Sequence, residues 1–216
     1  MKLAFVGGTG PEGLGLAMRM AHAGHEVAIG SRSTERGEEG AAKVREVVPA
    51  AVATGGANAD VVGDAEVVFL TFPYSGQHDT LAALGAKLDG KIVCNVVAPL
   101  EFEKGIGAVA LNVPGASAAQ EAAAQLPNAR VVSAFQNMSA EKLMEIDHEI
   151  DCDVLVCGRD AEAKQVVIAL ANQVAGVRGV DAGGLSQSRY VEMLTSLLIN
   201  LNRKYKTQTS VRIVGL

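Results

Sequence analysis

Residues Lys2 to Gly15 read KLAFVGGTGPEGLG, and this stretch decides the fold. It begins with a short apolar run typical of a buried parallel strand, and the run ends in glycines that lead into a helical pattern. Gly8, Gly10 and Gly13 have the spacing G-x-G-x-x-G. The first glycine of such a turn permits the tight bend, the second lets the backbone approach a diphosphate, and the third lets the helix pack closely on the strand.

The surroundings of the glycines separate this stretch from an ordinary glycine-rich turn. A helical pattern follows over residues 14–23, and a second strand pattern lies at residues 26–30. The free N–H groups and positive dipole end of the helix would point at the phosphates. Pro11 is tolerated because the first N–H groups of a helix have no acceptor within it. We therefore expect a Rossmann-type dinucleotide site at this turn.

The end of the second strand indicates which dinucleotide is bound. NAD-binding folds place an acidic residue there to hold the ribose 2′-hydroxyl. This chain has Ser31, Arg32 and Ser33 instead, with Arg36 one helical turn later. A guanidinium can form paired hydrogen bonds with a 2′-phosphate, which a carboxylate would repel. The alternative is that both arginines are solvated residues at a helix start, but the missing acid favours NADP(H).

Composition limits the class of protein. The chain has 216 residues, of which 49% are hydrophobic, enough for one sizeable core. Its formal net charge is −5 and it has no basic tract, so we do not expect a nucleic-acid partner. No apolar run is long enough to span a membrane, and the first residues lack the pattern of a signal peptide. Cys94, Cys152 and Cys157 form no C-x-x-C pair, which favours free thiols in a reducing cytoplasm.

Further strand and helix patterns continue the alternation of the first unit. Strands are expected at residues 52–54, 66–71, 91–95, 130–135, 153–156 and 177–181. Ligands of doubly wound sheets lie beyond the carboxyl ends of the strands, so Thr71, Phe72 and Pro73 should line the dinucleotide cleft. A long helix is expected at 186–204, and residues 210–214 alternate like a strand or an extended segment. The predicted fold is an α/β Rossmann-type doubly wound parallel sheet, with a dinucleotide-binding domain at 1–155 and a smaller α-rich part at 156–216.

The chain offers little acid–base machinery. It has no P-loop and no G-x-S-x-G nucleophile elbow, and no tyrosine is followed four residues later by lysine, as short-chain dehydrogenases require. His22 and His25 flank a predicted helix end, so we interpret them as surface residues and expect no metal site. We therefore expect no catalytic side chain. One chemistry remains open, direct hydride transfer between two stacked cofactors, for which the protein mainly provides position and excludes water.

Motifs along the whole chain resemble the NADP-dependent oxidoreductases that use the deazaflavin coenzyme F-420. The matching segments are Gly7–Gly10 with Gly13, Ser31–Arg32, Leu70–Pro73, Val132–Ala134, Asp153–Gly158, and Asp181–Ser186 with Ser188, Arg189, Val191 and Glu192. The C-terminal block D-A-G-x-L-S-x-S-R-x-V-E makes the resemblance specific, because an ordinary Rossmann turn does not predict it. The resemblance implies reversible hydride transfer between NADP(H) and coenzyme F-420 by a cytoplasmic enzyme, expected to be a homodimer.

The resemblance also assigns site residues by position. It implies a diphosphate loop formed by Thr9, Gly10, Pro11 and Glu12, with Ser31, Arg32 and Arg36 at the 2′-phosphate. Val97 and Ala98 would form a wall beside Thr71–Pro73, and the turn 134–140 would lie where the nicotinamide meets the deazaflavin, with Ala134, Gln136, Asn137 and Met138 as contacts. A histidine can occupy the position of Gln136 in this family, and glutamine keeps the hydrogen-bonding capacity but cannot carry a proton.

Two alternatives remain open. Metalloreductases have cytosolic domains of similar fold that pass hydride from NADPH to a flavin, so a flavin or another small acceptor could replace coenzyme F-420. A non-catalytic NADP(H)-binding sensor is the other. The segment 135–138 should separate an enzyme from a sensor, because an enzyme needs an open, ring-sized pocket there, which a sensor could fill with side chains.

Overall fold

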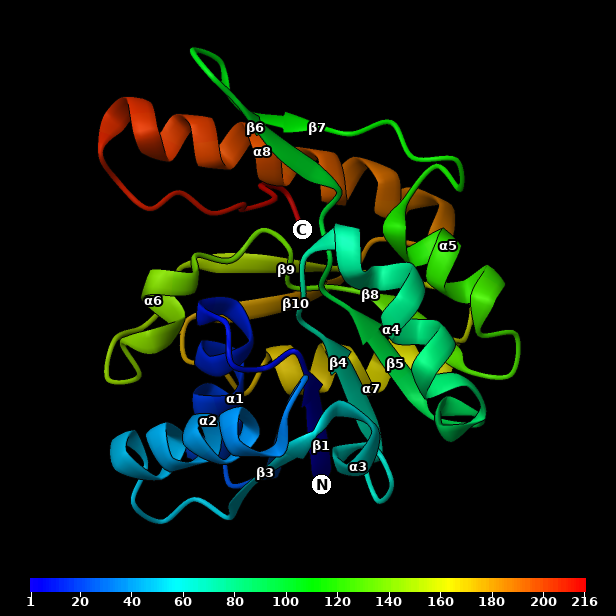
Figure 1. The fold of residues 1–216 in the computed structure, drawn as a ribbon. Coiled ribbons are helices and arrows are strands. Elements are labelled where there is room, and N and C mark those ends of the chain that lie inside the picture. The colour runs from blue at the N-terminus through cyan, green and yellow to red at the C-terminus, as the bar shows by residue number, and fades with distance from the viewer.

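The apolar runs of the chain form an eight-stranded sheet in the structure, a computed structural model that describes residues 1–216 (Figure 1). The strand order is β10-β9-β8-β5-β4-β1-β2-β3. The strands are β1 (Lys2–Val6), β2 (Glu26–Ser31), β3 (Ala53–Ala57), β4 (Val67–Leu70), β5 (Ile92–Asn95), β8 (Arg130–Ser133), β9 (Cys152–Gly158) and β10 (Val177–Asp181). All neighbours pair in parallel except β8 and β9, which are antiparallel. The Rossmann-type α/β fold is thus confirmed, with a mostly parallel sheet.

Helices cover both faces of the sheet. They are α1 (Pro11–His22), α2 (Thr34–Val47), α3 (Asn58–Val61), α4 (Gln77–Leu84), α5 (Ala118–Gln125), α6 (Ala140–Met144), α7 (Ala161–Ala171) and α8 (Ser188–Tyr205), with 3₁₀ turns at Tyr74–Gly76, Gly85–Leu88 and Leu185–Gln187. One buried cluster packs α1, α2, α6 and α7 on one face, and a second packs α4 and α5 on the other. Because the central strands are covered on both sides, they are continuous apolar runs.

Polar side chains cap the starts of two helices. The hydroxyl of Ser117 accepts a hydrogen bond from the N–H of Gln120 at 3.1 Å, and a carboxylate oxygen of Asp160 accepts one from Ala163 at 2.9 Å. Ser117 and Asp160 are thus the N-caps of α5 and α7. The long C-terminal helix also forms, within two residues of its predicted start.

Two local expectations were wrong, and two further features were not predicted. The strand expected at 130–135 ends at Ser133, because Phe135 has a positive φ of 74° and cannot continue an extended strand. Gly55 and Gly56 belong to β3 instead of a loop, since α2 packs so closely there that a Cβ on Gly55 would lie 2.2 Å from Gly37. The hairpin of β6 (Leu100–Glu103) and β7 (Gly107–Ala110), like the short helix α6, was not predicted.

The second half of the chain shares the sheet of the first. The expected boundary at residue 155 lies inside β9, and β10 pairs with β9. Residues 1–155 and 156–216 therefore contribute strands to one sheet. Figure 1 shows α8 beside the β6–β7 hairpin, at the end of the molecule opposite the N-terminus.

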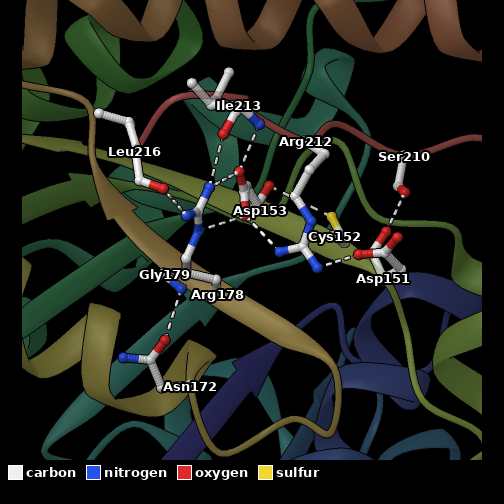
Figure 2. A network of polar contacts seen from close by, with 10 residues as sticks. All are labelled: Asp151, Cys152, Asp153, Asn172, Arg178, Gly179, Ser210, Arg212, Ile213 and Leu216. Atoms are coloured by element: carbon white, nitrogen blue, oxygen red, sulfur yellow. Dashed lines mark hydrogen bonds and ion pairs between the residues drawn. The ribbon is translucent and has the colours of Figure 1, made fainter.

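The segment after α8 is extended, but it forms no strand. It is held by Asp153, which is 1% exposed and accepts hydrogen bonds from Arg178 at 2.7 and 2.9 Å and from Arg212 at 2.8 Å (Figure 2). The N–H of Ile213 donates to the same carboxylate at 2.6 Å. These bonds hold the pKa of Asp153 well below its usual range.

Candidate functional site

The glycine-rich turn has the expected mechanics at two of its three glycines. A Cβ on Gly13 would lie 2.5 Å from the hydroxyl of Thr71, so only glycine lets α1 approach this closely. A Cβ on Gly10 would meet nothing nearer than 4.0 Å, which leaves open space beside the backbone at the start of α1. Both observations fit a turn that packs tightly against Thr71 at Gly13 and leaves room for a diphosphate at Gly10.

The tight bend falls one residue earlier than the motif predicts. Gly7 has the positive φ, 72°, whereas Gly8 does not. The N–H of Gly8 donates to the carbonyls of Phe5 and Gly30, at 3.0 and 2.9 Å, and a Cβ there would lie 2.7 Å from Phe5. Gly7 therefore makes the bend, and Gly8 joins the ends of β1 and β2.

A cavity of about 400 Å³ opens in front of this turn, at the carboxyl ends of the first strands. Eight of the predicted site residues are among its lining residues: Thr9, Gly10, Ser31, Arg32, Arg36, Thr71, Phe72 and Pro73. They come from the ends of β1, β2 and β4, segments that are distant in sequence but adjacent in the sheet. The structure thus brings the loop, the arginines and the cleft wall into one concave site.

The charge of this cavity suits an anionic ligand. Arg32 and Arg36 are its only charged lining residues, and no acidic side chain lines it. Both arginines are exposed, and neither side chain forms an ion pair or hydrogen bond with the protein. Ser33, which the sequence offered as a further donor, caps α2 and accepts from the N–H of Arg36 at 3.5 Å. Two free guanidinium groups at the edge of a cleft can bind a phosphate.

Three polar residues that line the cavity, Asn58, Ser75 and Thr80, were not predicted from the sequence. Asn58 also accepts a hydrogen bond from the N–H of Gly7 at 3.1 Å, so its side chain fixes the bend. It directly follows β3, and the rule that placed Thr71 at the end of β4 would have found it. Ser75 and Thr80 carry no comparable signal.

The turn 134–138 lies at the carboxyl end of β8, on the other side of β1 from the arginines. Phe135 holds its strained left-handed conformation with its ring against Phe69, at 5.8 Å between centroids. Strain of this kind costs of order 1–3 kcal/mol and is concentrated at functional sites. The turn is therefore a fixed feature of this edge and not a loose connection.

Two side-chain amides of this turn are only half satisfied. The Nε2 atom of Gln136 donates to the carbonyl of Asn95 at 3.1 Å and to the hydroxyl of Ser133 at 2.8 Å. The Nδ2 atom of Asn137 donates to α8, at Val191 and Thr195. Both amide oxygens are buried without a donor. Because an unsatisfied buried acceptor is costly, these oxygens suit a ligand that brings N–H groups.

The residues of this turn are closed off from solvent. Ala134, Phe135, Gln136, Asn137 and Met138 are all less than 9% exposed, and none of them lines the four main cavities. Helix α8 covers the turn, since Thr195 also donates to the carbonyl of Gln136 at 3.1 Å. Val97 is buried in the second core cluster, with its N–H bonded to Asn95, and Ala98 beside it is half-buried. The structure thus closes this half of the site with side chains.

A buried carboxylate attaches α8 to the core near the turn. Both oxygens of Glu192 accept backbone hydrogen bonds at the start of α5, from Ala118 at 2.7 Å and from Ala119 at 3.0 Å. Burial raises the pKa of Glu192 to about 7, while the two N–H groups act in the opposite direction. The C-terminal motif that contains Glu192 therefore has a structural role that its spacing did not reveal.

Glu12, at the second position of α1, has a different environment. Its Oε1 atom is buried, and no donor reaches it. Burial raises the pKa of Glu12 to about 8. Pro11 precedes it as the exposed first residue of the helix. The predicted diphosphate loop thus contains a carboxyl group that is mostly uncharged at neutral pH.

Known proteins are similar to this chain in sequence and in structure. The family model described as NADP oxidoreductase, coenzyme F-420-dependent, matches residues 2–99. The F-420-dependent NADP reductase of Methanocaldococcus jannaschii is 43% identical, over 100% of this chain and 99% of that protein. The crystal structure of an Arthrobacter sp. FB24 protein, described as a proposed F-420-dependent NADP-reductase, has a TM-score of 0.84 at 30% identity, with 99% of each chain covered. The rat metalloreductase STEAP3 is 28% identical, over 89% of this chain but 36% of its own length.

Proposed function

The chain belongs to the coenzyme F-420-dependent NADP oxidoreductase family, and from this membership we propose that it transfers hydride reversibly between NADP(H) and coenzyme F-420. The observation that carries the proposal is full-length similarity to named reductases, together with a cleft whose only charges are two free arginines. The metalloreductase similarity is weaker and covers about a third of that protein, so a flavin acceptor is the second choice.

The dinucleotide half of the site is the cavity at the ends of β1, β2 and β4. Arg32 and Arg36 would hold the 2′-phosphate, with the buried Ser31 beside them. The open space at Gly10 and the N-terminus of α1 would receive the diphosphate. The loop residues proposed for this contact are Gly8, Thr9, Gly10, Pro11, Glu12 and Gly13. Thr71, Phe72 and Pro73 then form the wall along which the nicotinamide riboside runs.

The acceptor half is the turn at the end of β8. Ala134, Gln136, Asn137 and Met138, with Val97 and Ala98 nearby, would surround the two rings where they meet. The unpaired amide oxygens of Gln136 and Asn137 are suited to the N–H groups of a carboxamide or an imide. No side chain here needs to carry a proton for hydride transfer, because the rings supply that chemistry and the protein aligns them.

One observation favours the non-catalytic alternative. The turn is covered by α8 and has no open pocket, which is the geometry expected of a sensor. If the protein is an enzyme, the bonds from Asn137 to Val191 and from Thr195 to Gln136 must open to admit the second ring. The named activity of the relatives favours the enzyme.

Turnover decides between these functions. Purified protein is mixed with NADPH and coenzyme F-420, and the visible absorbance of the deazaflavin is followed, with FMN and FAD in parallel. We expect bleaching of coenzyme F-420 and little turnover of the flavins. Turnover of flavins alone would move the assignment to a metalloreductase-like activity, and tight NADPH binding without turnover would identify a sensor.

The choice of NADP(H) is tested by Arg32→Ala. Loss of a charge-assisted phosphate contact should weaken NADPH binding by roughly 1.5–3 kcal/mol and leave NADH binding nearly unchanged. Lys43→Ala is the matched control, because Lys43 is an exposed cation of α2 that does not line the cavity. Equal weakening of both dinucleotides by Arg32→Ala would contradict the assignment.

The proposal includes a homodimer in the cytoplasm. Tyr190, Met193 and Leu197 are 61%, 46% and 52% exposed along one side of α8, and Phe102 and Ile106 are exposed on the adjoining hairpin. Exposed apolar side chains gathered on neighbouring elements mark interaction surfaces. Light scattering should give twice the chain mass for the wild type and the monomer mass for Leu197→Glu.

The three cysteines are free and buried, which supports a reducing compartment. None of the helices combines the length and the apolar character that a membrane span requires.

A further inference from the structure

Glu12 follows Gly10 of the dinucleotide cavity by two residues, although it does not itself line that cavity, and the role inferred for it rests on the proposed function. It stands between Gly10, which lines the dinucleotide cavity, and Gly13, which packs against Thr71. It is in the first turn of a helix whose N-terminus is proposed to receive the diphosphate. Its Oε1 atom is buried with no hydrogen-bond donor. A buried acceptor without a donor costs stability, so its presence in a native fold needs an explanation.

The direction that Glu12 faces follows from the rest of α1. Glu12, Gly15 and Arg19 are three and four residues apart, so they share one side of the helix. A Cβ on Gly15 would lie 2.6 Å from the Cβ of Leu143. The guanidinium of Arg19 donates to five backbone carbonyls, those of Lys142, Leu143, Glu145, Ile146 and His148. This side of α1 therefore packs on the segment that directly follows the turn 134–138.

The order of the strands indicates which part of a bound dinucleotide that side of α1 would face. Strands β4, β5 and β8 lie on one side of β1, and β2, which carries Arg32, lies on the other. A dinucleotide with its 2′-phosphate at Arg32 and its diphosphate at the start of α1 extends its nicotinamide toward β4 and β8. Glu12 thus lies on the nicotinamide side of the diphosphate.

No charged group of the protein pairs with Glu12, so a bound ligand can change its ionisation. The ionisable groups nearest to this side of α1 or at the cavity include Glu141 and Lys142 of α6, Arg19 of α1, and the two cavity residues Arg32 and Arg36, and none bonds to Glu12. Burial alone raises the pKa of Glu12, with no contribution from a neighbouring charge. A positive charge brought close by a ligand would therefore meet no competing partner.

We propose that Glu12 reports the redox state of the bound dinucleotide, remaining protonated beside the uncharged reduced nicotinamide and releasing its proton beside the positively charged oxidised ring. The released proton goes to solvent, and no covalent bond changes. Attraction between a carboxylate and the oxidised ring then favours NADP⁺ over NADPH once the pH is high enough for Glu12 to ionise. The position of Glu12 thus makes the relative affinity of the two dinucleotides depend on pH.

The experiment measures Kd for NADP⁺ and for NADPH from pH 6.5 to 9.5, in wild type and in Glu12→Gln. Both dinucleotides carry the same phosphates, so phosphate and arginine titration cancels in the ratio of the two constants. For the wild type we expect the ratio of the NADPH Kd to the NADP⁺ Kd to rise about tenfold between pH 7 and 9. For Glu12→Gln we expect a constant ratio. Glu141→Gln, which changes an exposed carboxylate of α6, should behave as the wild type.

Calorimetry gives a second measurement on the unmodified protein. Titrations in two buffers of different ionisation enthalpy should show up to about half a proton released when NADP⁺ binds near pH 8, because about half of the Glu12 groups of the free protein are already ionised there. None should be released when NADPH binds. A ratio independent of pH in the wild type, or a slope retained in Glu12→Gln, would overturn the proposal. Failure to bind either dinucleotide would overturn the proposed function as well. A pH-dependent ratio without turnover of coenzyme F-420 would support the role of Glu12 and contradict only hydride transfer.

Discussion

Asp153 is almost fully buried, whereas Glu12 is partly exposed with one buried carboxyl oxygen, and the structure surrounds the two groups in opposite ways. Asp153 accepts hydrogen bonds from two arginines and a backbone N–H, and these hold its pKa well below its usual range. Glu12 has an Oε1 atom with no donor, and burial raises its pKa to about 8. A buried charge with complete compensation holds the fold together, whereas a buried carboxyl without compensation costs stability and remains available to a ligand.

The largest effect is expected from Asp153→Asn. The two arginines would lose a carboxylate that anchors the segment after α8, and removing one partner of a buried ion pair costs roughly 3–5 kcal/mol. We expect about 3 kcal/mol, near the low end, because Arg178 and Arg212 keep 36% and 42% exposure and can be solvated. Urea unfolding at pH 7 measures the loss.

Asp151→Asn is the matched control for this prediction. Asp151 also pairs with Arg212, but it is 82% exposed, so its removal should cost at most about 1 kcal/mol. Equal losses from the two variants would show that the burial of Asp153 contributes nothing, and the comparison with Glu12 would then fail.

Glu12→Gln should raise the free energy of unfolding, whereas Asp153→Asn should lower it. The folded-state pKa of Glu12 is raised from 4.5 to about 8, so the wild type keeps its full stability below pH 4.5 and loses stability as the pH rises toward 8. Glutamine cannot ionise and avoids this loss. Because the Glu12 side chain is partly exposed, we discount the full shift and expect the variant to be about 2 kcal/mol more stable than the wild type above pH 8.

The two proteins should have equal unfolding free energies near pH 4, where Glu12 is protonated in both the folded and the unfolded chain. A series of urea titrations from pH 4 to 9 gives the difference at each pH. A variant that is less stable than the wild type at every pH would mean that Glu12 makes a stabilising contact, and it would place Glu12 in the same class as Asp153.

The contrast between the dinucleotide cleft and these two carboxyl groups also separates what the sequence could predict from what it could not. Most of the cleft was predictable because many of its residues lie at the end of a strand or just after it, as Ser31 and Thr71 do, and the order of a doubly wound sheet brings these ends together. The environments of Asp153 and Glu12 were not, because they depend on partners far along the chain. Asp153 meets Arg212 across 59 residues, and the side of α1 that carries Glu12 meets a segment more than 120 residues later.

The covered turn at 134–138 was unpredictable for the same reason. The pattern of residues marks Gln136 and Asn137 as ring contacts by resemblance, but their burial depends on α8, which arrives more than 50 residues later. Local spacing also misplaced the tight bend by one residue, since adjacent Gly7 and Gly8 are equally able to adopt a positive φ and only the packing against Phe5 decides between them.

The smallest effect is expected where backbone strain is relieved on the surface. Phe135 and Lys206 both have a positive φ, 74° and 52°, but Phe135 is buried at the site, whereas Lys206 ends α8 on the surface. Glycine adopts this conformation without a Cβ penalty and is the preferred residue after a helix. Lys206→Gly should therefore raise the unfolding free energy by about 0.5–1 kcal/mol and leave NADPH binding unchanged. Lys204→Gly, inside the helix, should lower the unfolding free energy by about 1 kcal/mol. If both variants are destabilised alike, the positive φ of Lys206 carries no strain. The comparison between a strained residue buried at the site, Phe135, and a strained residue on the surface, Lys206, would then fail.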